Sequence, residues 1–245
     1  KFRSQKEHPC RWSCNKLKKY MKDLITIGLP SKGRLKEKSI SFFNDRGLKI
    51  LQSEKERNYF GTIENENNIK IIFLHAKEII QRLGDGTLDI GVSGLDLLKE
   101  SNKNLQNKIN IQKKLDFGNA NLVIAVPDDW IDVQTIADLE EVSFDIRSKR
   151  NSRLRVATKY PNLTNDFLIS KGVTQYKLII SLGATETYPF IGSSEIITDI
   201  TSTGKTLADN NLRVLKDGLI LSSNACLFIA KKKAAKLQPF LKFFV

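Results

Sequence analysis

Short apolar runs alternate with amphipathic segments along this chain, and glycine-containing turns separate them. LITIGL (24–29) predicts a strand, and RLKEKSISFFNDRG (34–47) predicts a helix because its apolar residues recur near the helical period. The succession continues with KIIFL, AKEIIQRLGDG, LDIGVSG, LDLLKES, NLVIAVP, TIADLEE, RVAT, LTNDFLISKG, KLIIS and EIITDI. It predicts an α/β fold with parallel sheets, in which ligand loops follow the carboxyl ends of strands.

The alternation is broken at DFGNA (116–120), where we expect the chain to cross between two α/β lobes. Residues 21–117 and 220–245 are expected to form lobe I, and residues 118–219 lobe II. Residues 1–20 carry seven basic residues and one acid, so we expect a basic, disordered N-terminal extension. A basic organelle-targeting leader is an alternative. His8, Cys10 and Cys14 lack a fourth ligand at regular spacing, which argues against a metal site.

The composition limits the partners of the chain. A net charge of +13 over 245 residues is compatible with nucleic-acid binding, but no RNA-recognition signature, zinc finger or aromatic ladder accompanies it. We therefore expect a Lys-rich surface with phosphate sites and no nucleic-acid partner. The apolar runs are much shorter than the roughly 20 residues of a membrane span, so no membrane helix is expected. Three cysteines suggest no disulfide scaffold, and we expect a cytoplasmic protein.

DITSTGKTL (199–207) places an acid, four hydroxyl residues, a glycine and a lysine one residue after the apolar EII (195–197). A nucleotide-binding P-loop needs a glycine five residues before Gly204, but that residue is Asp199, whose carboxylate would repel a triphosphate. A hydroxyl-rich turn before a helix N-terminus with a partial charge of about +0.5 suits a monophosphate beside a sugar. The alternative is an ordinary strand, Ser/Thr turn and helix cap.

Three further glycine-containing loops, GLPSKGRL, GVSGLD and SLGATE, also follow predicted strands. Each alone is as typical of an ordinary turn as of a binding site. Together with DITSTGKTL they predict a ligand cleft between two α/β lobes. Their candidate binding residues are Lys32, Gly33, Arg34, Ser93, Gly94 and Glu186.

LPSKGRL, LDIGVSGLDLL, RVATKYPNLT, SLGATE and DITSTGKTL, in this order and spacing, resemble ATP phosphoribosyltransferase over about Asp23 to Lys231. This family opens histidine biosynthesis: it condenses ATP with 5-phosphoribosyl 1-diphosphate (PRPP), giving N1-(5-phosphoribosyl)-ATP and diphosphate, with Mg²⁺. The resemblance implies a fold like the type II periplasmic binding proteins, with two α/β lobes and the active site in the cleft between them.

The resemblance also implies roles for individual residues. Asp199 would meet the ribose hydroxyls of PRPP. Its 5′-phosphate would be held by Thr201, Ser202, Thr203, Gly204, Lys205 and Thr206. ATP would be bound by Lys32, Gly33, Arg34, Ser93, Gly94 and Glu186, with Arg34, Lys32 and Glu186 as catalytic candidates. Mg²⁺ would be held through substrate, with no direct protein ligand.

The residue types suit this chemistry. Adenine N1 is already a nucleophile and diphosphate is a good leaving group, so the enzyme needs positioning and charge stabilisation more than a strong base. Arg34 and Lys32 could neutralise phosphate charge. The chain has only two histidines, and we expect His75 to be a strand-end residue. RSKRNSRLR (147–155) is most typical of a solvated loop, with a contribution to a phosphate-rich cleft as the alternative.

Some features depart from the family pattern. Lys205 stands where small or neutral residues are common, and LHAKEI replaces an Arg-containing segment, so no role passes to His75 or Lys77. Since the sequence stops at Val245, before any C-terminal regulatory domain of the long family form, we expect a short form. Such a form would work with a histidyl-tRNA-synthetase-like regulatory subunit, as a hetero-oligomer or homodimer.

Two other functions remain open. One is a non-catalytic binding protein of the periplasmic type for a phosphorylated small molecule, because the fold alone does not separate binding from catalysis. Residues 1–20 lack the apolar region of an export signal, which weakens that interpretation. The other is a nucleic-acid-binding protein driven by charge.

Overall fold

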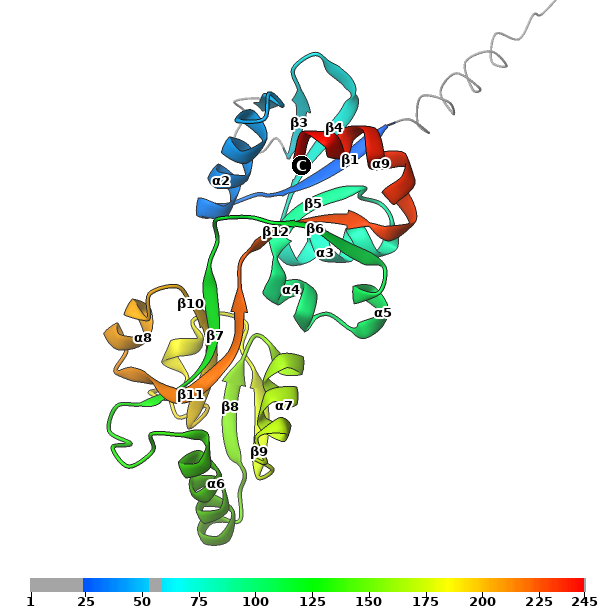
Figure 1. The fold of residues 1–245 in the computed structure, drawn as a ribbon. Coiled ribbons are helices and arrows are strands. Elements are labelled where there is room, and N and C mark those ends of the chain that lie inside the picture. Colours follow the sequence, from blue (N-terminus) through cyan, green and yellow to red (C-terminus); the bar gives the residue numbers. More distant parts are fainter. Residues whose placement is uncertain (1–23, 53–58, 245) are drawn as a thin grey trace, which may run out of the picture. The chain divides into compact units, whose positions relative to one another are not determined.

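The structure, a computed structural model, describes residues 24–52 and 59–244, which form two compact units (Figure 1). The first unit contains the described residues up to Ser93, together with Lys108–Lys113 and the chain from Leu227 onward. The second unit contains Gly94–Asn107 and Lys114–Cys226. The expected N-terminal extension, with His8, Cys10 and Cys14, lies outside the described residues.

The first unit is built on a seven-stranded sheet of order β2-β3-β4-β1-β5-β12-β6. As predicted from the alternation, β1 runs parallel to β4 and β5. The antiparallel addition of β2 and β3 to β4 was not predicted. The strands are β1 (Ile25–Pro30), β2 (Ile50–Gln52), β3 (Phe60–Ile63), β4 (Glu66–Leu74), β5 (Ile90–Gly94), β6 (Ile109–Lys114) and β12 (Ala225–Ala230).

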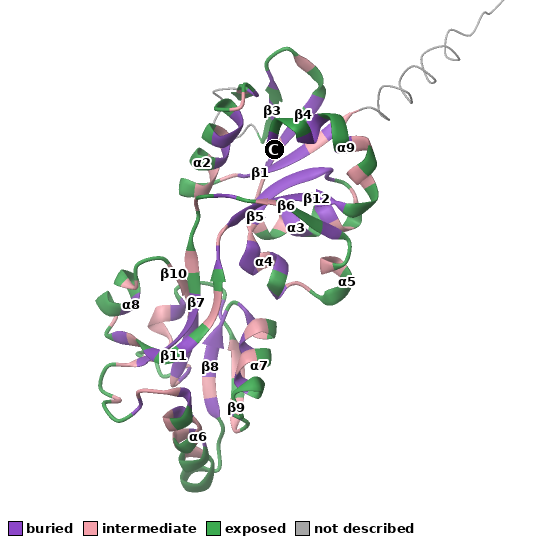
Figure 2. Cartoon of the chain, in the orientation of Figure 1, coloured by how far each residue is buried: buried purple, intermediate pink, exposed green. Residues whose placement is uncertain are grey.

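The middle strands of this sheet are buried, and helices pack on them (Figure 2). All six residues of β12 are buried, as are most of β1 and β5. Both α2 and α3 pack against β1. This double cover explains why these strands read as continuous apolar runs. The helical segments are α2 (Gly33–Asn44), α3 (Ala76–Asp85), α9 (Ala234–Leu241) and the short turns η2 (Lys231–Lys233) and η3 (Lys242–Phe244).

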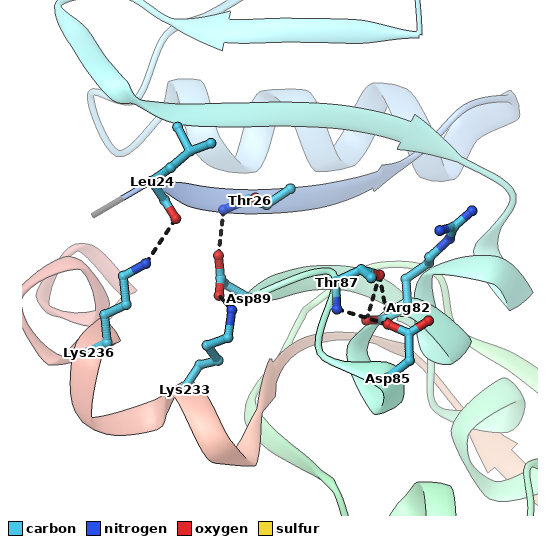
Figure 3. A network of polar contacts seen from close by, with 8 residues as sticks. All are labelled: Leu24, Thr26, Arg82, Asp85, Thr87, Asp89, Lys233 and Lys236. Atoms are coloured by element: carbon cyan, nitrogen blue, oxygen red, sulfur yellow. Dashed lines mark hydrogen bonds and ion pairs between the residues drawn. The ribbon is translucent and has the colours of Figure 1, made fainter. Parts of the chain in front are cut away.

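A buried aspartate joins the C-terminal part of the first unit to its first strand (Figure 3). Asp89 is 2% exposed; its Oδ2 accepts the backbone N–H of Thr26 at 2.7 Å, and its Oδ1 accepts from Lys233 Nζ at 2.7 Å. Lys236 Nζ donates to the carbonyl oxygen of Leu24 at 2.9 Å. A buried carboxylate is tolerated when donors satisfy it in this way, so these contacts fix the α9 region against β1.

The second unit is built on a five-stranded sheet of order β11-β7-β10-β8-β9. β8 is parallel to β9 and β10, but β7 is antiparallel to both β10 and β11. The expectation of a wholly parallel sheet is therefore wrong here, because apolar runs encode burial and not strand direction. The strands are β7 (Ala120–Pro127), β8 (Leu154–Thr158), β9 (Tyr176–Ile180), β10 (Ile196–Thr201) and β11 (Leu212–Ser223).

This sheet is buried on both faces. Ile124, Val156 and Ile196 belong to one hydrophobic cluster, whereas their chain neighbours Val123, Ala157 and Ile197 belong to another. Successive strand residues face opposite sides, so the two clusters lie on the two faces of the sheet. The helical segments of this unit are α4 (Leu95–Glu100), α5 (Lys103–Gln106), α6 (Ile136–Arg150), α7 (Pro161–Ser170), η1 (Thr185–Thr187) and α8 (Lys205–Asp209).

The structure confirms only part of the interpretation of residues 147–155 as a solvated loop: residues 147–153 are exposed, but only 151–153 form a loop. Helix α6 begins at a capping box formed by Thr135 and Asp138 and continues to Arg150, so the basic run supplies its last turn. Cations at that end are favourable because they offset the helix dipole. Arg155 lies in β8 and forms an ion pair with Glu195, with Nη2 2.6 Å from Oε1. The run is therefore an exposed helix end, a three-residue exposed loop and the start of β8.

Helix α4 belongs to the second unit, which differs from the expected lobe boundary at residue 117. Asp96 on α4 accepts hydrogen bonds from Tyr160 Oη at 2.9 Å and from Ser223 Oγ at 2.7 Å. Glu100 accepts the backbone N–H groups of Asn162 and Leu163, each at 3.0 Å. These buried polar contacts attach α4 to the start of α7 and the end of β11.

Candidate functional site

The segment DITSTGKTL forms the end of β10, a turn and the short helix α8. Asp199 pairs with Val123 of β7, and the strand continues beyond it to Thr201 instead of ending at the acid. Gly204 has a φ of 74°, a left-handed conformation that favours glycine. Its N–H donates to Thr201 Oγ1 at 2.8 Å, so a hydroxyl of the loop orders the turn.

The side chains of this turn are open to solvent. Ser202, Thr203, Lys205 and Thr206 are all exposed. Helix α8 has only five residues, so a helix dipole is a small contribution here. The hydroxyls, the backbone N–H groups and one ammonium could together hold a tetrahedral anion.

Asp199 is half-buried, and its environment is electrostatically mixed. Burial raises the pKa of its carboxyl, while the Ile200 N–H and the ammonium of Lys159 lower it and the carboxylate of Glu186 raises it. Two predicted residues, Asp199 and Glu186, are thus close enough to influence each other. Such a pair offers oxygen acceptors to sugar hydroxyls or to the waters of a divalent cation.

Glu186 sits on η1, after a turn with a strained residue. Ala184 has a φ of 41°, which is uncommon without a glycine. Ser181 Oγ donates to the Gly183 carbonyl oxygen at 3.0 Å and contacts Thr185 Oγ1 at 2.9 Å, and both hydroxyls are buried. Strained turns persist where surrounding contacts hold them, so Glu186 is presented on a fixed support.

Lys32, Gly33 and Arg34 lie in the first unit at the start of α2. Lys32 is the extended N-cap residue, and Gly33 opens the helix with a φ of 69°. All three are exposed, and in the part of the chain that the structure describes neither Lys32 nor Arg34 forms an ion pair. Their cationic groups are therefore available to an anionic ligand.

Ser93 and Gly94 have structural roles at the end of β5. Ser93 is fully buried, and its Oγ donates to the Ala76 carbonyl oxygen at 2.8 Å. A Cβ on Gly94 would lie 2.2 Å from Asp96 Oδ1, so packing requires glycine there. Ser93 belongs to the first unit. Gly94, Glu186 and the 199–206 turn belong to the second.

His75 and the acidic side chains of the described ranges form no cluster typical of a metal centre held by the protein alone. His75 directly follows β4 and is the N-cap of α3, where its Nδ1 accepts the Lys77 N–H at 3.3 Å. Across residues 24–52 and 59–244, no group of three or more His, Cys, Asp or Glu side chains could hold a metal ion. Within the same ranges, no helix is long and apolar enough to cross a membrane.

The sequence analysis missed a ring of three buried threonines beside Asp199. Thr158 of β8, Thr164 of α7 and Thr198 of β10 are fully buried. Their Oγ1 atoms are 3.0 Å (158–164), 2.9 Å (164–198) and 2.5 Å (198–158) apart. Buried hydroxyls need partners. Threonines near the ends of the two predicted strands RVAT and EIITDI were the signal that could have revealed the ring.

Two α/β units, each built on one sheet, give the chain a fold like that of the type II periplasmic binding proteins. The structure resembles the ancestral amino acid-binding protein AncCDT-1, with a TM-score of 0.51 at 14% identity over 93% of this chain and 91% of that one. It is more similar to the ATP phosphoribosyl transferase (HisG:HisZ) complex from Thermotoga maritima: the TM-score is 0.68 at 24% identity, over 90% and 96% of the two chains.

The sequence comparisons are more specific. The HisG family model, described as ATP phosphoribosyltransferase, matches residues 75–243. The ATP phosphoribosyltransferase of Brucella melitensis biotype 2 (strain ATCC 23457) is 46% identical over 209 residues, covering 85% of this chain and 90% of the relative. That of Chelativorans sp. (strain BNC1) is 46% identical over 210 residues, covering 85% and 91%. The chain belongs to the ATP phosphoribosyltransferase family, and it is a transferase of histidine biosynthesis.

Proposed function

We propose that this chain condenses ATP and PRPP to N1-(5-phosphoribosyl)-ATP and diphosphate, and that the 199–206 turn binds the sugar phosphate. The observation that carries the proposal is the form of this turn in a member of this family. It presents exposed hydroxyls and the exposed Lys205 beside a half-buried carboxylate at the end of β10. A monophosphate attached to a ribose requires this combination of donors and acceptor.

On the PRPP side, Asp199 accepts hydrogen bonds from ribose hydroxyls. Its half-buried position makes this contact stronger than it would be in water, because the local dielectric constant is lower. The 5′-phosphate is held by the residues of the turn and of the first turn of α8, which are Thr201, Ser202, Thr203, Gly204, Lys205 and Thr206.

On the ATP side, Arg34 and Lys32 neutralise phosphate charge, and the guanidinium of Arg34 can do so with two parallel hydrogen bonds. Gly33 lets the backbone turn into α2 beside them. Ser93 and Gly94 contribute the shape of the β5 loop, because the Ser93 hydroxyl proton is already donated to Ala76. Glu186 positions the substrates; with adenine N1 already nucleophilic, no strong base is needed.

We also propose that Mg²⁺ takes part, bound through substrate oxygens. Asp199 and Glu186 fit it: they are hard oxygen donors, and burial, followed by repulsion from Glu186, raises the pKa of Asp199. Both would reach the ion through its waters. When bound, Mg²⁺ neutralises charge on the diphosphate leaving group.

The partner and the cellular site belong to the same proposal. The Thermotoga maritima relative was solved as a HisG:HisZ complex, which supports a regulatory subunit for this chain, in a hetero-oligomer or with a homodimer of this chain. We propose the cytoplasm as its location because the enzyme acts on phosphorylated metabolites.

The test is an assay with ATP, PRPP and Mg²⁺, with the nucleotide product followed by ultraviolet absorbance and diphosphate measured separately. We expect both products to form in equal amounts, with omission of PRPP as the control. If PRPP binds but no diphosphate appears, even with a candidate regulatory subunit present, the chain is a binding protein and the proposal fails.

A further inference from the structure

We infer that Lys159 contacts a phosphate group of PRPP, and that the ring of three threonine hydroxyls is what positions it. The inference rests on the proposed function, because it adds a residue to the same site. No motif that points to phosphate binding marks Lys159 in the sequence. Its place follows from strand register: Thr158 of β8 pairs with Thr198 of the parallel β10, so Lys159 and Asp199 are the next residues at the same level.

The threonine ring holds the carboxyl ends of β8 and β10 in place beside Lys159 and Asp199. It joins the ends of β8 and β10 to the first turns of α7 through three short hydrogen bonds, all shielded from water. Thr158 Oγ1 also accepts the Tyr160 N–H at 2.9 Å, and Tyr160 Oη donates to buried Asp96 at 2.9 Å. Both chain neighbours of Lys159 are therefore held, and Lys159 is the exposed residue between two buried ones.

The charge of Lys159 is available to a ligand. It forms no ion pair in the described residues, yet it is near enough to Asp199 to lower the pKa of that carboxyl. The other titratable groups near Asp199 do not attract a phosphate. Glu186 on η1 is an anion. The phenol of Tyr160 is uncharged, because burial and the carboxylate of Asp96 raise its pKa. An ammonium beside the acid that receives the ribose is in reach of a phosphate on that ribose.

The first experiment compares Lys159→Gln with Lys177→Gln, an exposed lysine on the neighbouring strand β9. For Lys159→Gln we expect KM for PRPP to rise about tenfold or more and KM for ATP to change less than about twofold, because one charge-assisted contact is lost. Lys159→Arg keeps the charge and should recover most of the loss. Lys177→Gln should match the wild type.

Competition experiments show whether Lys159 contacts the 5′-phosphate or the diphosphate of PRPP. Ribose 5-phosphate carries the 5′-phosphate alone, and inorganic diphosphate stands for the leaving group. The competitor whose inhibition constant rises in Lys159→Gln identifies the phosphate that Lys159 contacts, and an unchanged inhibition constant for both would overturn the inference.

The second experiment tests the positioning role. Thr198→Val removes one hydroxyl from the ring at nearly constant volume, and Thr198→Ser restores it. If the ring positions Lys159, Thr198→Val raises KM for PRPP selectively, the serine variant recovers it, and adding Lys159→Gln to Thr198→Val causes little further loss. Equal effects on both substrates would show that the ring has a general structural role.

The pH dependence of kcat/KM for PRPP is a third measurement, and a purely structural role of Lys159 would leave it unchanged. Without the Lys159 ammonium the pKa of Asp199 rises further, so the acid limb of kcat/KM for PRPP should move to higher pH in Lys159→Gln. If the wild type is active and Lys159→Gln behaves like Lys177→Gln in every assay, only this inference fails. If the wild type neither turns over nor binds PRPP, the proposed function fails, and this inference with it.

Discussion

The pKa of Asp199, in the second unit, is shifted by burial and by two neighbouring charged side chains. Its pKa is raised mainly by burial, and the charges of Lys159 and Glu186 act on it in opposite directions. A raised pKa means that the carboxylate is lost at a higher pH than for an exposed aspartate. Because the ionised carboxylate accepts hydrogen bonds from ribose hydroxyls more strongly than the protonated acid does, PRPP binding should weaken on acidification before ATP binding does.

Substitutions should separate the two substrates at the level of residues. Asp199→Asn removes an ionised acceptor and Thr203→Val removes an exposed hydroxyl. Each should raise KM for PRPP about tenfold or more, with KM for ATP nearly unchanged, since contacts to charged groups are the strong ones. Arg34→Ala should instead raise KM for ATP or lower kcat. Steady-state kinetics with each substrate varied in turn provides the measurement.

Arg46→Ala is a control for the Arg34 variant, because Arg46 lies at the other end of α2 and its guanidinium is engaged with Phe42. It should leave both KM values near those of the wild type. Small, equal changes in both KM values for Asp199→Asn and Thr203→Val would contradict the assignment of the turn to PRPP.

At the level of elements, the N-terminus of α7 depends on a side chain from α4. Glu100 is 8% exposed and accepts the N–H groups of Asn162 and Leu163, which α7 cannot satisfy internally. Glu100→Ala should lower the free energy of unfolding by about 1–3 kcal/mol, because buried donors lose their acceptor. Urea denaturation measures this. Glu141→Ala, an exposed glutamate on α6, is the control, and equal losses in both variants would refute the role of Glu100.

The sequence predicts elements well where burial determines the pattern. Strands β1, β7, β8 and β10 were found because a strand covered on both faces is mostly apolar. The partly exposed strands β2 and β3 carry no such apolar run, and they were missed. The direction of β7 was also wrong, since direction depends on pairing between distant segments. Among candidate site residues, loops after strands could be recognised, whereas the threonine ring depends on contacts up to 40 residues apart.

At the level of the whole molecule, the candidate residues are divided between two compact units. Lys32, Gly33 and Arg34 belong to the first unit, and Glu186 and Asp199 belong to the second. The first-unit side chains Lys32 and Arg34 are exposed cations, whereas the second-unit candidates combine hydroxyls and carboxylates with the ammonium groups of Lys159 and Lys205. Cations suit the triphosphate of ATP, and the second set suits a sugar phosphate. The division agrees with the proposed assignment of Lys32 and Arg34 to ATP and of the 199–206 turn to PRPP.

Regulation is the remaining property of the whole molecule. Histidine can inhibit only by binding one state of the enzyme better than another, and this requires a site distinct from the substrate sites. No candidate residue of the described chain suggests a histidine-specific site, while the Thermotoga maritima relative is a complex with HisZ. We therefore expect histidine control to depend on a regulatory subunit that resembles histidyl-tRNA synthetase.

Titration with histidine tests this expectation. The chain alone should have low activity that changes little with histidine. After it is mixed with the candidate subunit from the same source, activity should rise and become sensitive to histidine, because the added site is coupled to the catalytic one. By reciprocity, histidine should also weaken substrate binding to the assembled enzyme, which calorimetry can measure. Full activity and tight histidine inhibition in the isolated chain would contradict the prediction and place the histidine site in this chain.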